Sequence, residues 1–421
     1  MNPILYAIPI FMATVALEAV LAWRLRGNRI ADAAGGTRAI YQFADAVGSL
    51  QIGLLSRIAA AFPRLLTVGL YILAYQQFAV MEWDKSNPLA WVAAVVVYDF
   101  FYYWKHRANH EVRIMWAGHV THHNSEHFNL STALRQSSTT FVFDWMFYLP
   151  MAVLGVPPEM WVTAALIDLL YQYWTHTELI GRLGWFDRVF VSPSNHRVHH
   201  GQNDYCIDRN YGGIFIIWDR LFGTFQEERD EEPVVYGIRK PLRSYNAVWG
   251  NLHVWKELFT HSWRALRRGN ASGAIAVFFA PPAGWGQHVE HLDTKTVVRF
   301  DTATPRTVRM YALVQYGVFS LYATHFIAVA PELSLGIRLL YAGVIAAGAL
   351  SVGWLLEGRK FALPVEALRL ALMGGAFFLL PTWFGWVPTP QVKMAVLALL
   401  ATSLAWLGVG RVKVPEARAS S

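Results

Sequence analysis

The stretch DFFYYWKHRANHEVRIMWAGHVTHH, residues 99–123, decides how the rest of this sequence is read. An aromatic, apolar run leads directly into closely spaced histidines, and further histidine groups follow later in the chain. Such clusters are typical of metal sites, because neutral imidazole nitrogen is a common ligand. His127 also lies in this region, outside the paired pattern. The candidate metal ligands are His106, His110, His119, His122, His123, His176, His196, His199 and His200.

The composition of the chain is that of a membrane protein. Of its 421 residues 54% are hydrophobic and 15% are charged, against about a quarter charged in soluble proteins. The net charge of +7 comes mostly from short loops beside apolar runs, which is a topology signal and gives no support for nucleic-acid binding. Cys206 is the only cysteine, so an intramolecular disulfide and a thiolate cluster are excluded. Nitrogen and oxygen must therefore supply the ligands of any metal.

We expect an all-α polytopic fold with about nine transmembrane helices, because about 20 apolar residues cross a bilayer. The N-terminal run lacks a preceding basic region and a cleavage site, so we interpret it as a span and not as a signal peptide. The candidate spans are 4–23, 61–81, 88–104, 138–155, 159–175, 309–330, 335–355, 364–383 and 391–409.

The basic residues of the loops predict the orientation of these spans. Arg24 and Arg26 follow the first span, and Arg359 and Lys360 follow the seventh, so these ends face the cytoplasm. The acidic loop 82–87 is expected outside. With nine spans, all the clustered histidines lie on one face of the membrane. We therefore expect a multi-pass protein of a bacterial inner membrane or the endoplasmic reticulum, with its site on the cytoplasmic side.

Four regions are expected along the chain. Residues 1–85 would hold N-terminal transmembrane helices and residues 86–230 the catalytic region. Residues 231–308 would be a cytosolic segment at the membrane interface, and residues 309–421 the C-terminal transmembrane helices.

Helical spacing places two carboxylates behind the histidines. Asp99 shares a helix face with His106 and His110, and Asp168 lies two four-residue steps before His176. Ionisable groups inside spans suggest function. We expect Asp99 and Asp168 to accept the far N–H of ligand imidazoles, and a hydrogen bond between packed helices is the alternative.

The number of imidazoles indicates two metals, since one metal takes four to six ligands. A nitrogen-rich set without thiolate suits iron, zinc or copper, and the spacing does not choose among them. Two irons at a membrane surface can activate oxygen and attack a lipid C–H bond, whereas zinc would offer only hydrolysis. Iron is therefore preferred.

The order H-x-x-x-H, H-x-x-H-H, an isolated His and a second H-x-x-H-H resembles the fatty acid hydroxylase and sterol desaturase superfamily of membrane di-iron oxygenases. Within it the chain is most similar to the alkylglycerol monooxygenase branch, and the similarity extends more weakly to GWGQ, residues 284–287. The matching stretches are HRANHE (106–111), HVTHHNSEHFNLSTALRQS (119–137), LIDLLYQYWTHTE (166–178) and SPSNHRVHHGQNDYCIDRNYGGIFIIWDRLFGTF (192–225).

This resemblance implies that the chain hydroxylates the carbon next to the ether oxygen of an alkylglycerol, releasing fatty aldehyde and glycerol. It implies two iron ions as cofactor, O2 and a lipid as substrates, and an external electron donor, which is tetrahydrobiopterin in the animal members. Glu111 matches the conserved acid that follows the first histidine pair. The alternatives are a sterol or fatty acyl hydroxylase or desaturase of the same superfamily and, from another class, a metal transporter or metal-binding membrane protein.

Three further sites lie beside the histidine groups. Arg135 could bind a lipid headgroup or a cofactor, or belong to a polar helix at the membrane interface. Glu178, two residues after His176, could support that ligand. The paired glycines of DRNYGG, residues 208–213, permit a tight turn or a close backbone approach.

Overall fold

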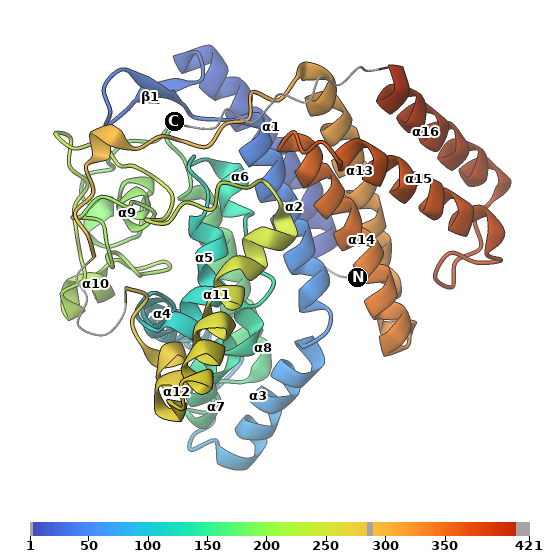
Figure 1. The fold of residues 1–421 in the computed structure, drawn as a ribbon. Coiled ribbons are helices and arrows are strands. Elements are labelled where there is room, and N and C mark those ends of the chain that lie inside the picture. The colour runs from blue at the N-terminus through green and yellow to red at the C-terminus, as the bar shows by residue number, and fades with distance from the viewer. Residues whose placement is uncertain (1–2, 284–288, 410–421) are drawn as a thin grey trace. The chain divides into compact units, whose positions relative to one another are not determined.

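The computed structural model describes residues 3–283 and 289–409. The described chain is mostly helical, and it divides into two compact units (Figure 1). Unit 1 comprises the chain to residue 42 with residues 62–242 and 251–298, and unit 2 comprises residues 43–61, 243–250 and the chain from residue 299. The weakly similar GWGQ segment lies outside the described residues.

Unit 1 contains the first histidine stretch and most of the short elements. Its two strands pair antiparallel, with Arg29 opposite Ala39. Helix α11 begins in unit 2, and all but its first turn belongs to unit 1. The elements are α1 (Pro3–Arg26), β1 (Arg29–Ala31), β2 (Thr37–Ala39), α3 (Arg64–Phe78), α4 (Pro88–Glu111), α5 (Arg113–His123), α6 (Leu130–Ala133), η1 (Thr140–Val142), η2 (Asp144–Tyr148), α7 (Leu149–Val153), α8 (Pro158–Trp174), η3 (Phe186–Arg188), α9 (Pro193–His199), α10 (Ile217–Phe222), α11 (Ala247–Arg267), α12 (Ala271–Phe279) and η4 (Thr294–Thr296).

Unit 2 is built from long apolar helices, coloured orange to red for the C-terminal part in Figure 1. Polar side chains join these helices in their interior: Arg369 donates to Glu366 at 2.7 Å and to Gln315 at 2.9 Å. In lipid such groups must find partners inside the protein, so this network holds the helices together. The elements are α2 (Phe43–Ala60), α13 (Arg306–Val329), η5 (Ala330–Glu332), α14 (Leu335–Leu356), α15 (Ala362–Leu379) and α16 (Pro390–Val409).

Five helices of the described chain are long and apolar enough to cross a membrane, so the chain is an integral membrane protein. This is fewer than the nine spans expected. The expected spans at 61–81 and 159–175 form α3 and α8, which have only 15 and 17 residues. The span expected at 88–104 lies in α4, whose last turns carry the charged and histidine residues. The five candidates are Ile8–Arg26, Arg306–Glu332, Leu335–Leu356, Ala362–Leu379 and Pro390–Gly408.

The prediction of one helix over residues 138–155 is wrong. This segment forms the short elements η1, η2 and α7. Pro150 lies at the start of α7, where its missing N–H costs nothing, but it would interrupt a longer helix. Tyr148 and Met151 are buried in a core with residues of α4 and α8. The apolar character of this segment therefore reflects packing against protein.

The break between α4 and α5 determines the direction in which the histidine side chains of these two helices point. α4 begins with Asn87, whose side chain accepts a hydrogen bond from the N–H of Leu89 at 3.0 Å, followed by Pro88. The helix stops at Val112, which is extended (φ −116°, ψ 119°), and α5 starts at the next residue. The change of direction at one residue lets two consecutive helices present histidines to the same volume.

Candidate metal centre

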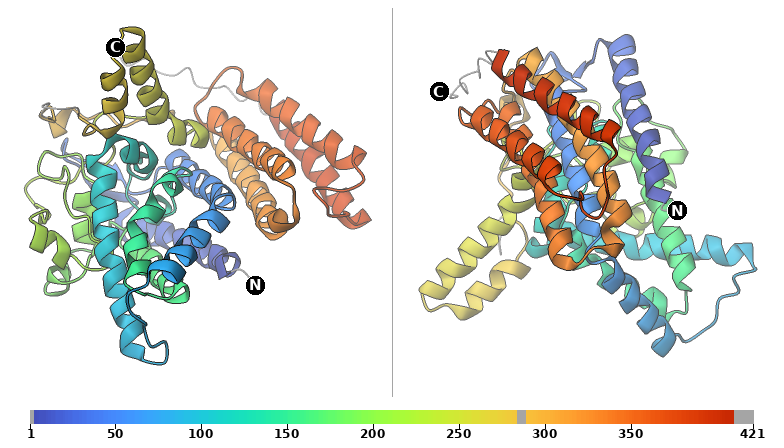
Figure 2. Two further views of the ribbon diagram at one scale, coloured as in Figure 1. Left: turned by 90° about the horizontal axis from the view of Figure 1, so that it is seen from below. Right: turned by 90° about the vertical axis from the view of Figure 1, so that its right-hand side faces the viewer.

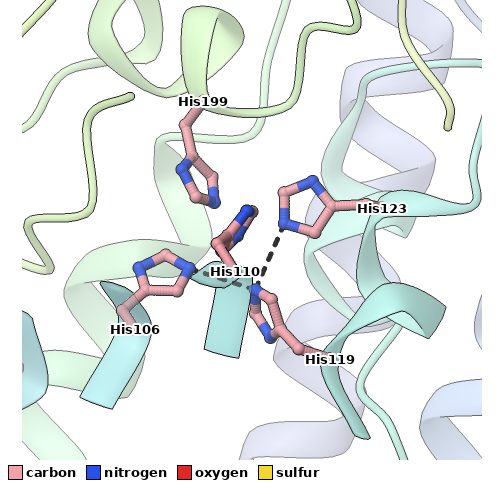
Figure 3. Close-up of side chains that lie close together, drawn as sticks. All are labelled: His106, His110, His119, His123 and His199. Carbon is pink, nitrogen blue, oxygen red and sulfur yellow. Dashed lines mark hydrogen bonds between the residues drawn. The ribbon is translucent and has the colours of Figure 1, made fainter. Parts of the chain in front are cut away.

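Two groups of buried histidine side chains lie inside unit 1. In each group the nearest ring nitrogens are all within 4.8 Å of one another. Figure 3 shows the five-histidine group, whose rings come from α4, α5 and α9 and turn toward a common centre. His127 is in neither group, since its Nδ1 lies 2.9 Å from the Ala39 carbonyl oxygen. The five-histidine group is His106, His110, His119, His123 and His199, and the four-histidine group is His122, His176, His196 and His200.

Each H-x-x-H-H motif serves both groups. In α5, His119 and His123 are four residues apart and belong to the five-histidine group, while His122 between them belongs to the other. In the second motif the assignment of the residues to the two groups is reversed. His196 and His200, four residues apart, belong to the four-histidine group, and His199 belongs to the five-histidine group. A helix turn of 3.6 residues explains this, since positions i and i+4 share a face and position i+3 is rotated away.

Backbone carbonyl groups set the tautomer of four ligands. The Nδ1–H of His106 donates to the Tyr211 carbonyl at 2.8 Å, and that of His122 donates to the Arg135 carbonyl at 3.1 Å. His176 and His199 make the same contact, with the Gln172 and Arg209 carbonyls, at 2.9 and 3.0 Å. A carbonyl oxygen only accepts, so the proton is on Nδ1 and the Nε2 lone pair faces the interior of the group.

Burial keeps these rings neutral. It lowers the pKa of His122 to about 4 and that of His199 to about 3, although their carbonyl partners act in the opposite direction. The pKa of His119 is lowered further by the histidines around it. Neutral imidazole is the form that binds a metal, so the groups are ready for ligation at neutral pH.

The distances between ring nitrogens fit a bound cation. The Nε2 atoms of His122 and His176 are 3.2 Å apart, and both carry lone pairs because both Nδ1 protons are engaged with carbonyl groups. The Nε2 atoms of His106 and His119 are 3.1 Å apart. Two lone pairs this close repel unless a cation lies between them, and metal–nitrogen bonds of about 2.1 Å at right angles place neighbouring ligands roughly 3 Å apart. The residues of each group therefore fit one metal ion.

Comparison with known proteins identifies the family of this chain. The fatty acid hydroxylase family model matches residues 91–224, which contain all nine histidines of the two groups. Human alkylglycerol monooxygenase is 35% identical over 97% of this chain and 89% of the human protein. The chain belongs to the alkylglycerol monooxygenase family. The Danio rerio enzyme of this name is 34% identical over 87% of the chain and 80% of its own length. No solved structure matches the chain.

Membership of this family makes the chain an oxygenase, and the histidine groups are compatible with its metal centre. More distant relatives are an ornithine lipid hydroxylase from Rhizobium tropici, 29% identical over 42% of this chain and 54% of its own length, and mouse lathosterol oxidase, 27% identical over 38% and 55%. Each of these matches covers less than half of this chain.

Asp99 and Asp168 contact groups other than the imidazoles expected from the sequence. Asp99 accepts from the backbone N–H groups of Ile214 and Phe215 at 2.6 and 3.0 Å, and from the Trp218 indole at 2.9 Å. Asp168 accepts from the Gln172 amide at 2.6 Å. Backbone carbonyl groups accept the Nδ1–H of His106 and His176. The two carboxylates therefore do not contact these imidazoles directly, and bind the neighbouring groups named above.

Gly213 allows the two carboxylates to approach the loop that follows Tyr211. A Cβ atom at this position would lie 2.4 Å from Asp168 Oδ1 and 2.7 Å from Asp99 Oδ1. Only glycine fits so close an approach. The loop in turn supplies the Tyr211 carbonyl that orients His106, and so Asp99 positions a ligand through backbone.

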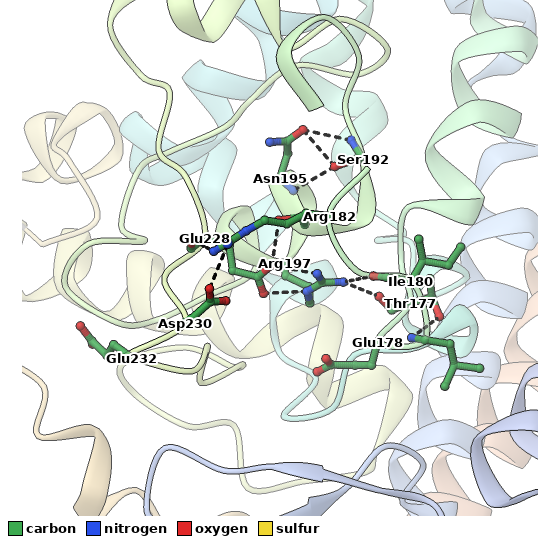
Figure 4. Close-up of polar contacts among 12 residues, drawn as sticks. Thr177, Glu178, Ile180, Arg182, Ser192, Asn195, Arg197, Glu228, Asp230 and Glu232 are labelled. Atoms are coloured by element: carbon green, nitrogen blue, oxygen red, sulfur yellow. Dashed lines mark hydrogen bonds and ion pairs between the residues drawn. The ribbon is translucent and has the colours of Figure 1, made fainter. Parts of the chain in front are cut away.

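Glu178 lies near His176 but forms a buried ion pair with Arg38 of β2. The neighbouring Arg197, between ligands of α9, holds the same segment. It donates to the Thr177 and Ile180 carbonyls at 3.0 and 2.8 Å and binds both oxygens of Glu228 at 2.7 and 2.8 Å (Figure 4). This network fastens the backbone that follows His176 to α9, which carries His196 and His199 and is followed directly by His200.

Arg135 and Glu111 also have defined surroundings. Arg135 is 2% exposed, and its Nε donates to the Thr121 carbonyl of α5 at 2.9 Å, a place suited to holding the helix and not to reaching a headgroup. Glu111 accepts from Arg107 at 2.8 Å, and both border an open groove of about 350 Å³ with Trp104, Ala108, Val112 and Phe147. Glu111 belongs to neither histidine group.

Three supporting residues were missed from the sequence: Glu18, Arg38 and Arg197. Glu18 lies inside a candidate span and accepts from the Leu130 N–H at 2.7 Å and from Thr177. The sequence could have indicated Glu18, because a carboxylate inside a membrane span suggests a functional or structural role. Arg197 could have been noticed as the one charged residue within its histidine motif. Nothing in the local sequence marks Arg38.

Proposed function

We propose that this chain is a membrane di-iron monooxygenase that cleaves alkylglycerol ethers. It hydroxylates the carbon next to the ether oxygen, and the hemiacetal collapses to a fatty aldehyde and glycerol. The observation that carries the proposal is the pair of adjacent histidine groups, joined with the similarity to human alkylglycerol monooxygenase over 97% of the chain.

The donor set is compatible with iron, and the family resemblance favours it over zinc or copper. The nine ligands are neutral nitrogen donors, and the single thiol, Cys206, is buried in a separate apolar cluster with Val198 and Val234. When bound, two irons would supply the activation of O2 and the attack on an unactivated C–H bond. Hydroxylation takes one oxygen atom from O2 and reduces the other to water, so two electrons and two protons must come from a donor. The resemblance supports a tetrahydropterin as that donor.

The chain's own residues orient the centre. The carbonyls of Tyr211, Arg135, Gln172 and Arg209 hold the Nδ1 protons of four ligands, which directs the Nε2 lone pairs inward. We assign Asp99, Asp168, Glu178 and Arg135 to positioning the backbone that supplies these contacts. Glu111, the residue after His110 in the chain, borders the groove lined by Trp104 and Phe147, and we assign it to binding the polar part of the lipid.

We place the centre on the cytoplasmic side, in a bacterial inner membrane or the endoplasmic reticulum. Basic residues Arg24 and Arg26 in the last turn of α1 support this orientation. Asp230, exposed in the loop that Arg182 contacts, offers a test. In a C206A background, a cysteine at position 230 should react with an impermeant thiol reagent only from the cytoplasmic face of sealed vesicles. Reaction from the opposite face would overturn the assignment.

A hydroxylase acting on another lipid is the second candidate. It is supported by the matches to an ornithine lipid hydroxylase and to lathosterol oxidase, which cover only 42% and 38% of this chain. The metal centre would be the same and the substrate different. A metal transporter is disfavoured, because the ligands gather in two adjacent groups and not along a path across the membrane.

The deciding experiment is turnover by the purified chain in lipid nanodiscs. An alkylglycerol, O2 and a series of reductants are supplied, and fatty aldehyde and bound metal are measured. About two irons per chain and aldehyde that depends on O2 support the proposal. His325, outside both groups and 2.9 Å from the Tyr341 hydroxyl, provides the control: H325A should retain activity that H122A and H199A lose. Zinc alone, or product only from an acyl lipid or sterol, would overturn it.

A further inference from the structure

Helices α11, from Asn251 onward, and α12 form a pair of helices that the metal centre does not use. Figure 2 shows them side by side, in yellow, and the Phe259 and Phe278 rings pack between them with centroids 5.8 Å apart. α12 has nine residues, about 14 Å of helix, which is too short to cross a bilayer. α11 carries charged residues along its length and is not among the candidate spans.

The exposed part of α11 has two chemically distinct faces beside the face that packs on protein. The packed face includes Asn251 and Leu258, which are buried. An adjacent face is apolar and exposed, with Phe259 at 59% and Trp263 at 61%. The third face is polar. By helical spacing the apolar face holds Leu252, Phe259, Trp263 and Leu266, and the polar face holds His253, Glu257, His261 and Arg264.

The apolar surface continues onto α12. Ile275 and Phe279, four residues apart, are 65% and 59% exposed, while Ala274 beside them is buried. Contiguous exposed apolar surface with a polar rim is typical of a surface that contacts another body. The aromatic residues among them suit the interface between water and the apolar part of a membrane.

The turn between the two helices is basic. Arg264, Arg267 and Arg268 lie there, all exposed, and none of the three forms an ion pair with a described residue. Three uncompensated guanidinium groups beside an apolar stripe attract an anionic surface. This charge argues for lipid headgroups and against a second copy of the same basic face, which would bring like charges together.

The helix pair is fastened to the backbone around the ligands. The Asn251 side chain accepts from the Ser138 N–H at 2.7 Å, and the Trp255 indole donates to Thr139 at 3.1 Å. The Ala280 carbonyl accepts from the Arg113 N–H at the first residue of α5, at 2.9 Å. α5 carries His119, His122 and His123. A surface that binds α11 and α12 therefore lies close to α5 and its three histidines.

We propose that α11 and α12 dock on the anionic headgroup surface of the bilayer. Phe259, Trp263 and Ile275 enter the interfacial layer, and the basic turn binds the acidic phospholipid headgroups. This is a lipid-binding surface separate from the substrate site. It holds the α5 side of the centre at the level of the headgroups, where an amphipathic lipid presents the junction between its chain and its head.

The test places a nitroxide at single cysteines in a C206A background, in nanodiscs that contain one chain each. Labels at positions 263 and 275 report the apolar face, and a label at His261 on the polar face of the same helix is the matched control. Collision with an aqueous nickel chelate and with O2 is compared in nanodiscs of phosphatidylcholine alone and with phosphatidylglycerol. Bound metal is measured in every sample as the sign of a folded centre.

With phosphatidylglycerol, labels at 263 and 275 should be shielded from the nickel chelate and exposed to O2, while the label at 261 stays accessible to the chelate. The variant R264Q/R267Q/R268Q should lower the ratio of docked to undocked pairs about 100-fold, because each basic residue near an acidic surface contributes about fivefold. The variant R264K/R267K/R268K should retain docking. Labels that stay accessible to the chelate in every lipid, or shielding that is equal in phosphatidylcholine alone, would overturn the proposal.

Discussion

Replacing Arg197 with methionine should loosen the four-histidine group without touching a ligand. The arginine makes two hydrogen bonds to Glu228 and two to the Thr177 and Ile180 carbonyls. These contacts join α9 to the backbone that directly follows His176. Methionine fills much of the same volume but donates no hydrogen bond, so the variant removes the polar contacts with little change in packing.

The size of the effect follows from burial. The Arg197 and Glu228 side chains are 7% and 18% exposed, and breaking a buried ion pair costs about 3–5 kcal/mol. Glu228 keeps one donor, the Ser194 hydroxyl at 2.8 Å, and some contact with solvent, so the lower end applies. A loss of about 3 kcal/mol weakens the hold on this backbone roughly 100-fold. The metal at the four-histidine group should then be lost first.

The assay is metal content after dialysis against a chelator that the unaltered protein withstands. R197M should fall from about two metals per chain to about one. Lys85 offers the control, because its ion pair with Glu159 is exposed and such pairs contribute about 0–1 kcal/mol; K85M should keep both metals. R197M/E228Q should recover part of the loss, since it removes the unpaired charge. If R197M keeps both metals at the unaltered chelator resistance, the positioning argument is refuted.

Three other changes probe the centre. H122A and H199A each remove a ligand from a different group, so each should lower the metal content by about one and abolish aldehyde formation, as metal analysis and turnover will measure. G213A places a Cβ atom 2.4 Å from Asp168 Oδ1 and should destabilise the centre, whereas G181A, with no atom within 4 Å of its Cβ, should not; thermal unfolding compares the two. D99N gives up one acceptor oxygen where three N–H groups donate, and should lower the free energy of unfolding by about 1–3 kcal/mol in denaturant titration.

The grouping of the nine candidate histidines could be predicted, because their spacing is a local property of the sequence. Residues four apart share a helix face, so H-x-x-x-H and H-x-x-H-H show which side chains can meet a common atom. The mostly helical fold was predicted from the long apolar runs, each about as long as a membrane-spanning helix. Five apolar helices qualify as spans, and the signal for the other four was ambiguous, because apolar runs also form where a helix is buried in protein. Residues 138–155 are such a case, packed as short turns between α4 and α8.

The partners of the supporting groups could not be predicted, since they depend on contacts across the chain. Arg38 and Glu178 are 140 residues apart, and Glu18 reaches Leu130 over 112 residues. The role expected for Asp99 assumed that a carboxylate holds the imidazole N–H. Backbone carbonyl groups accept this N–H instead. Every residue has a backbone carbonyl group, so the residue types of a sequence do not indicate which one binds an imidazole.

The interleaving of the two motifs links the two histidine groups through the backbone, and would couple two metals bound there. α5 supplies His119 and His123 to one group and His122 to the other, and His199 crosses in the same way from α9. A metal bound in either group therefore fixes a helix that carries ligands of the second, so part of the ordering that the second site requires is already complete. His122 is the histidine that the first motif contributes to the four-histidine group, and His199 is the one that the second motif contributes to the five-histidine group. Removal of either therefore takes one histidine from one group and leaves the i, i+4 pair of the same motif in the other group.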